Sequence, residues 1–116
     1  MKNKDRIILK KIVRYCDDIH ILMDEYETDY THFVEKISFQ YACNMCIIQI
    51  GELVGRLSEE FVSEHSTIPW RAIKAMRNLH AHDYERVDLE IVWDTLVNEI
   101  PKLKEYIEQA MEQINA

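Results

Sequence analysis

Side chains that could carry chemistry are concentrated in one short stretch, residues 70–87. It reads Trp-Arg-Ala-Ile-Lys-Ala-Met-Arg-Asn-Leu-His-Ala-His-Asp-Tyr-Glu-Arg-Val. Residues 70–86 hold four of the 14 Lys and Arg residues but only two of the 21 Asp and Glu residues, in a chain with a formal net charge of −7. Long amphipathic patterns on both sides are typical of packing helices. We therefore expect a catalytic or binding site within this stretch.

Three cations of the stretch have helical spacing. Arg71, Lys74 and Arg77 follow at i, i+3 and i+6, which places them along one side of a helix as a basic ridge. An ordinary solvated helix face has the same pattern. As a functional surface, the ridge would bind substrate phosphate.

Arg77 and His82 are the pair whose chemistry is most specific. An imidazole can move protons at the 2'-hydroxyl or the leaving oxygen of RNA, while a guanidinium stabilises charge on phosphorus, so the pair could cleave RNA without a metal. A structural role for a His near a helix end is the alternative. Asn78 lies four residues before His82, so its amide could hydrogen-bond the ring and fix its tautomer.

The spacing of the pair also constrains the site. Arg77 and His82 would lie about 140° apart around an ideal helix, so they cannot hold one phosphate from a single regular helix. Either the helix ends before His82 and the chain bends back, or two protomers related by a two-fold axis share the site.

Two other motifs suggest metal binding but are poorly placed for it. The His residues of His80-x-His82-Asp83 would point about 160° apart on a helix, and no second cluster with familiar spacing supplies further ligands, so we predict no metal site. Cys43-x-x-Cys46 has no partner pair and lies among apolar residues, which favours core packing over zinc or redox use. Trp70 and Trp93 are expected to be core or interface aromatics.

Four helical patterns would position this stretch. Apolar residues at three- and four-residue spacing predict helices over about residues 4–27, 32–61 and 69–82, followed by a fourth helix that Asp88 caps. Gly51 inside the second pattern predicts a close helix crossing. Pro101 should kink or divide the fourth helix. Glu52 could pair with an Arg of the stretch, although an exposed carboxylate is the simpler expectation.

Composition agrees with an all-α fold in one domain, residues 1–116. The chain has only two Gly and two Pro, and 47% of its residues are hydrophobic. Its negative charge argues against a general nucleic-acid coat. It shows neither an N-terminal apolar signal nor a run long enough to span a bilayer, and its three Cys are an odd number. We therefore predict a cytoplasmic protein with free thiols and no membrane contact.

The stretch resembles a known family. Residues 77–84, Arg-Asn-Leu-His-Ala-His-Asp-Tyr, match the Arg-x-x-x-x-His-x-Tyr pattern of the HEPN superfamily, and specifically of its HepT branch. Ile50-Gly51-Glu52, Ile68-Pro69-Trp70 and Val87-Asp88-Leu89 with Trp93 are also similar to HepT. The similarity spans essentially the whole chain. It implies an up-and-down bundle of four to five helices.

The resemblance also implies a function. HepT toxins of HepT–MntA toxin–antitoxin pairs are metal-independent ribonucleases that dimerise so that two motifs face each other across a cleft. Arg77 and His82 would be catalytic, Asn78 would support them, and Arg71 and Lys74 would lie on the substrate-binding ridge. Tyr84 would receive AMP from an MntA-like nucleotidyltransferase antitoxin that uses ATP and Mg, while the toxin itself would need no cofactor. Bulk and phosphate charge beside the ridge would then block RNA.

One alternative function stays open. HEPN domains also occur beside nucleotidyltransferases as non-catalytic interaction modules. The acidic surface favours such a module, whereas the complete set of Arg77, Asn78, His82 and Tyr84 favours the toxin. The role of His80 is not assigned by either function.

Overall fold

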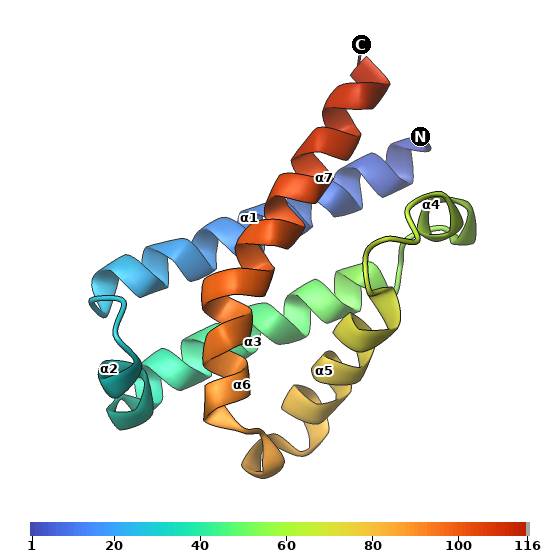
Figure 1. Cartoon of the computed structure of the whole chain (residues 1–116). Helices are drawn as coiled ribbons and strands as arrows, with labels where there is room; N and C mark the ends of the chain where they lie inside the picture. Colours follow the sequence, from blue (N-terminus) through green and yellow to red (C-terminus); the bar gives the residue numbers. More distant parts are fainter. Residues whose placement is uncertain (116) are drawn as a thin grey trace.

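The protein is an all-α bundle, as predicted. The computed structural model describes the backbone of residues 1–115 and the side chains of residues 1–112, and this part of the chain contains no β-strand. In chain order, the elements are α1 (Asn3–Glu25), α2 (Tyr30–Glu35), α3 (Ile37–Val54), α4 (Glu59–Glu64), α5 (Trp70–His82), a 3₁₀ turn (Tyr84–Arg86), α6 (Leu89–Asp94), a π turn (Thr95–Glu99) and α7 (Ile100–Asn115). Four long rods, α1, α3, α5 and the continuous run from α6 to α7, dominate the bundle, and α2 and α4 are short connections (Figure 1).

Helix α3 is the centre of the bundle. It packs against α1 on one side and α5 on the other, and α1 also contacts α7. Figure 1 shows α1 and α3 running side by side in opposite directions. Both faces of α3 therefore carry buried side chains. In the core as a whole, the largest fully enclosed side chains include Phe33, Phe39, Leu9, Ile12, Ile19, Leu96 and Ile107. Enclosing each such side chain contributes about 1.5–3 kcal/mol relative to exposure, so this apolar core holds α1, α3 and α7 together. The buried residues of α5 are Trp70 and His80.

The predicted second helix is wrong in its extent. Instead of one helix over residues 32–61, the chain forms α2, α3 and α4. Lys36 takes an extended backbone (φ −102°, ψ 99°) between α2 and α3. Ser58 then caps α4 by accepting a hydrogen bond from the amide of Phe61. The apolar pattern continues across both breaks because all three helices face the same core.

Helix α5 agrees with its prediction to within one residue. Pro69 precedes its first residue, and Trp70 anchors that end because its side chain is buried and its indole N–H donates to the carbonyl of His65, 3.0 Å away. The helix continues without interruption to its last residue, His82, and the backbone of the next residue, Asp83, is not helical (φ −149°, ψ 47°). The motif residues from Arg77 to His82 therefore share one regular helix.

The last rod accommodates its proline without a break. The Asp88 side chain accepts a hydrogen bond from the amide of Glu90, which confirms the predicted cap. Pro101 does not divide the rod, because every residue from Leu89 to Asn115 is helical. The widened turn lies just ahead of Pro101, where the amide of Ile100 donates to the carbonyl of Thr95.

The cysteines and tryptophans belong to the core, as predicted. All three thiols are free and buried. Burial is the main cause that raises the pKa of Cys16 and Cys43 to about 12 and that of Cys46 to about 11. Trp70 is buried, and Trp93 packs against Phe33 with ring centroids 5.3 Å apart. In the described part of the chain, no helix is long and apolar enough to cross a membrane.

Candidate functional site

Arg77 lies where α5 crosses α3. A Cβ atom added at Gly51 would lie only 2.2 Å from the Cβ of Arg77, so the two helices could not approach this closely with any other residue at position 51. The prediction of a close crossing at Gly51 is thus confirmed. The absence of a side chain on α3 lets the stem of Arg77 lie directly over its backbone.

Two side chains hold the guanidinium of Arg77. Its Nη2 forms an ion pair with Oε1 of Glu52, and its Nη1 donates a 2.8 Å hydrogen bond to Oδ1 of Asn78. Its Nε is buried without a hydrogen-bond partner. The simpler expectation of an exposed, unpaired Glu52 was therefore wrong. Sequence reasoning ranked the pairing second because only the crossing at Gly51 shows that residues 52 and 77 meet.

Asn78 supports Arg77 rather than His82. Its amide oxygen accepts from the neighbouring guanidinium, and among the described residues no hydrogen bond joins Asn78 to His82. The predicted contact that would fix the tautomer of His82 is not present.

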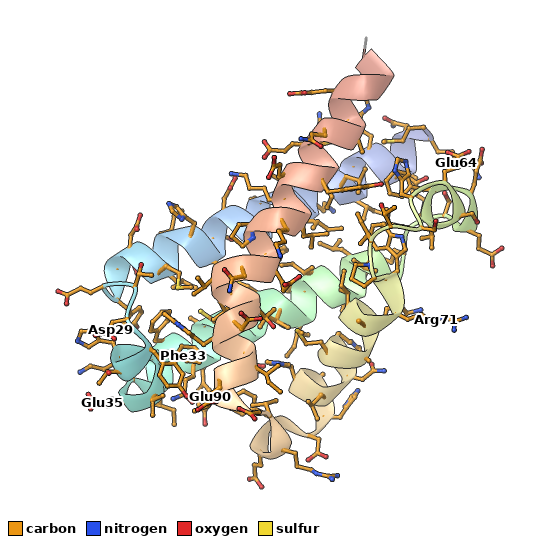
Figure 2. All side chains as sticks on the ribbon, viewed as in Figure 1. Asp29, Phe33, Glu35, Glu64, Arg71 and Glu90 are labelled. Atoms are coloured by element: carbon orange, nitrogen blue, oxygen red, sulfur yellow. The ribbon has the colours of Figure 1, made fainter. Side chains whose placement is uncertain are left out.

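A shallow groove opens beside Arg77. It has a volume of about 290 Å³ and lies between the C-terminal end of α3 and one side of α5; it is lined by Gly51, Glu52, Gly55, Arg56, Lys74, Arg77 and Asn78. Lys74 and Arg77 of the predicted ridge therefore meet on this groove. Arg71 is not part of its lining, and Figure 2 shows Arg71 projecting from the start of α5 away from the bundle.

His82 is the last residue of α5 and is exposed. Because α5 is regular between Arg77 and His82, the two side chains diverge by about 140° around its axis. The chain does not bend back before His82, so the first of the two arrangements considered from the sequence is wrong. Sharing between two protomers stays a prediction.

His80 is buried, whereas His82 is exposed. The His80 side chain is enclosed, and its Nδ1 hydrogen-bonds the amide oxygen of Asn44 on α3. Burial lowers the pKa of His80, which favours the neutral ring. His80 therefore ties α5 to α3. Nowhere in the described part of the chain do three or more His, Cys, Asp or Glu residues gather as a potential metal site.

Tyr84 lies beyond the end of α5, in the 3₁₀ turn, so it does not share a helical stripe with Arg77. Its hydroxyl donates a 3.2 Å hydrogen bond to Oε1 of Gln40, and its ring packs edge-on against Tyr41 at 5.7 Å between centroids. Burial, followed by the influence of Tyr41 and Cys43, raises the pKa of Tyr84, so the hydroxyl keeps its proton near neutral pH. The partners Gln40, Asn44 and Arg56 had no local signal in the sequence.

Comparison with known proteins gives a consistent result. The model of the family described as "Ribonuclease HepT-like" matches residues 9–110. A candidate RNase of Methanocaldococcus jannaschii is 30% identical over 113 residues, which cover 97% of this chain and 92% of that protein. A candidate RNase of Caldanaerobacter subterraneus subsp. tengcongensis is 38% identical over 64 residues, 55% of this chain and 57% of that protein.

A protein of Thermococcus cleftensis named "Probable ribonuclease HepT" is 35% identical over 65 residues, which cover 56% of this chain and 59% of that protein. No solved structure gives a significant match. The family match spans most of the chain and includes Arg77, Asn78, His82 and Tyr84. The chain therefore belongs to the HepT-like family of ribonucleases.

Proposed function

We propose that this protein is the toxin of a toxin–antitoxin pair, a metal-independent endoribonuclease whose active site forms in a cleft between two copies of the chain. Arg77 of one copy and His82 of the other would act on the same phosphate. The observation that carries the proposal is the placement of Arg77, whose guanidinium is held by Glu52 and Asn78 at the edge of a basic groove.

The chemistry needs only these two side chains. The neutral imidazole of His82 takes the proton of the ribose 2'-hydroxyl, and the 2'-oxygen attacks phosphorus. The bond from phosphorus to the 5'-oxygen breaks, and that oxygen takes a proton from water, to which the His82 imidazolium returns the proton that it took. The products are a cyclic 2',3'-phosphate and a 5'-hydroxyl. Arg77 stabilises the negative charge that develops on the phosphoryl oxygens.

Exposed apolar side chains beside the motif favour a second copy as the partner of this face. Tyr41 and Met45, one turn apart on α3, are 55% and 56% exposed, and Leu79 on α5 is 38% exposed. Leu79 lies three residues before His82, so the two share one side of α5. Covering this patch with the same patch of another chain would remove apolar surface from water and bring His82 to the interface.

Tyr84 would be the site of control. An MntA-like nucleotidyltransferase, using ATP and Mg, would transfer AMP to its hydroxyl and release pyrophosphate. Each AMP adds bulk and a negative phosphate near the end of α5, which would oppose RNA binding through steric overlap and charge repulsion. The hydroxyl must first leave Gln40.

The decisive experiment compares the wild-type chain with His82→Ala. The purified wild-type protein should cleave a mixed RNA substrate in the presence of EDTA, and the variant should be slower by about 10²- to 10⁴-fold while its circular dichroism is unchanged. Induced alone in a bacterial host at matched protein level, the wild type should arrest growth and His82→Ala should not. If neither does so and both are folded, the non-catalytic interaction module replaces this proposal.

A further inference from the structure

The groove beside Arg77 extends beyond the residues that the catalytic proposal uses. Its lining includes Arg56, which follows the end of α3, and Lys74, one helical turn before Arg77. Both side chains belong to exposed residues, and among the described residues no ion pair involves either of them. The single carboxylate of the lining, Glu52, is already paired with Arg77. The groove thus keeps two uncompensated cations in a chain of net charge −7.

Both glycines of the chain line this groove. Gly51 is required by packing against Arg77, but Gly55 has no such explanation. Its backbone is ordinary right-handed helix (φ −64°, ψ −16°), and a Cβ atom there would lie 3.4 Å from the carbonyl oxygen of Glu52, an ordinary contact. A side chain at position 55 would be compatible with the fold. Its absence leaves the backbone bare at the floor of the groove.

Lys74 lies over this bare floor. Its Cε is 3.8 Å from the position that a Cβ of residue 55 would occupy, so a branched side chain larger than Ala at 55 would compete with the end of Lys74 for the same space. Lys74 and Arg77 are separated by one turn, about 5 Å along the axis of α5. A strand whose scissile phosphate lies at Arg77 would therefore bring its neighbouring phosphate to Lys74 and Arg56.

We propose that Arg56 and Lys74, with the open floor at Gly55, form a subsite that binds the RNA phosphate next to the scissile one. The proposal rests on the proposed ribonuclease function and extends it to the substrate. The groove, at about 290 Å³, is of a size to hold one unit of a single strand rather than a duplex. Binding there would be electrostatic and independent of base identity.

The test measures RNA binding separately from cleavage. In the His82→Ala background, a short labelled single-stranded RNA is titrated by fluorescence anisotropy at several KCl concentrations. The double variant Arg56→Gln and Lys74→Gln should bind at least about tenfold more weakly at low salt. The slope of log affinity against log salt should fall by about 0.7, since the subsite contacts one phosphate and each single-strand phosphate contact contributes about 0.7.

A matched control has the same change in charge elsewhere. Lys10→Gln and Lys11→Gln alter two exposed residues of α1, which packs on α3 and α7 and does not line the groove. This control should change the affinity by less than about twofold. An equal loss of affinity in both double variants would mean that only net charge matters and would overturn the subsite.

A third variant tests the shape of the groove without a change in charge. Gly55→Leu should weaken RNA binding about three- to tenfold by displacing Lys74, while Gly55→Ala should have a much smaller effect. Unchanged binding of Gly55→Leu would contradict the subsite, as would an affinity for an acidic peptide that matches that for RNA. If the chain binds RNA as described but the wild type does not cleave it, the subsite stands and the catalytic proposal fails. If the wild type cleaves RNA but the groove variants bind it as tightly as their parent, the catalytic proposal stands and the subsite fails.

Discussion

Glu52 on α3 and Arg77 on α5 form an ion pair across the point where the two helices cross. Both side chains are about one-third exposed or less, at 34% and 28%. The pair therefore lies at the rim of the groove, where RNA phosphate would compete with the carboxylate for the same guanidinium. Glu52 is a positioning residue in this arrangement, because it acts on substrate only through Arg77.

Replacing Glu52 should separate turnover from affinity. In Glu52→Gln, kcat for RNA cleavage should fall about 10- to 100-fold because Arg77 is no longer held in one orientation. Affinity for RNA should stay equal or rise because a negative charge leaves the groove. Stability should change by no more than about 1 kcal/mol, since the pair is partly solvated. Single-turnover kinetics and anisotropy measure the two effects, with Glu35→Gln as a matched control on α2; a parallel loss of both would argue against a positioning role.

The two glycines should respond oppositely to the same substitution. Gly51→Ala places a Cβ atom against Arg77, so α5 must move; this should destabilise the protein by about 1–3 kcal/mol and abolish cleavage. Gly55→Ala meets only ordinary contacts and restricts the unfolded chain, so it should be neutral or stabilising by up to about 1 kcal/mol. Urea unfolding of both variants provides the comparison. Equal stabilities would mean that the crossing tolerates a side chain.

A site shared between two chains predicts complementation. Arg77→Ala and His82→Ala should each be inactive, whereas a mixture of the two allowed to exchange subunits should regain about a quarter of wild-type activity. Half of the dimers would then be mixed, and each would have one of its two sites intact. Light scattering should also find at least a dimer at micromolar concentration. A mixture without activity, or an active monomer, would exclude the shared site.

Modification of Tyr84 should depend on Gln40. The amide nitrogen of Gln40 donates to the carbonyls of Phe33 and Val34, at 2.9 and 3.0 Å, which directs its oxygen toward the Tyr84 hydroxyl. With a cognate nucleotidyltransferase and ATP, intact mass should rise in steps of AMP, and Tyr84→Phe should remove the rise. Gln40→Ala should accelerate the first step about fivefold, because one hydrogen bond of about 1 kcal/mol no longer holds the hydroxyl. Modification of Tyr84→Phe would assign the acceptor elsewhere.

His80 should make the fold sensitive to acid. Burial lowers its pKa in the folded state below the ordinary value of 6.5, so the unfolded chain binds the proton more readily. The stability associated with neutral His80 is fully present above about pH 6.5 and declines as the pH falls toward the lowered pKa. Urea unfolding at about pH 8 and about pH 5.5 should show the loss, and His80→Gln should reduce it. An identical pH dependence in His80→Gln would assign the effect to other groups.

The parts of the fold that local signals mark could be predicted from the sequence. Pro69 marks the start of α5, Asp88 caps α6, and Gly51 indicates the close crossing. The break at Ser58 also has a local signal, a Ser followed by two acidic residues, but the continuing apolar pattern obscured it. Lys36 has no such signal, because its extended backbone follows from how α2 and α3 both pack on the core rather than from its own residue type.

The candidate site was predictable only in part, for the same reason. Arg77, His82 and Tyr84 are recognised together because they lie within eight residues of one another. Glu52, Gln40 and Asn44 come from α3, and their pairing with residues of the motif depends on the rotation of α3 against α5. Which side chains meet across two helices depends on how the helices pack. The sequence therefore suggested that Glu52 could pair with Arg77 but could not favour this pairing over an exposed carboxylate.

The π turn ahead of Pro101 also sets how far α7 is rotated about its axis relative to α6. Val92, Leu96 and Ile100 are buried at intervals of four residues, which would drift around an ideal α-helix by about 40° at each step. The wider turn over Thr95–Glu99 absorbs this drift, so Ile100 and Ile107 continue the buried face of α6. Removing one residue from this turn would rotate α7 by about 100° relative to α6 and turn Ile107 out of the core, without changing any residue that α7 itself contains.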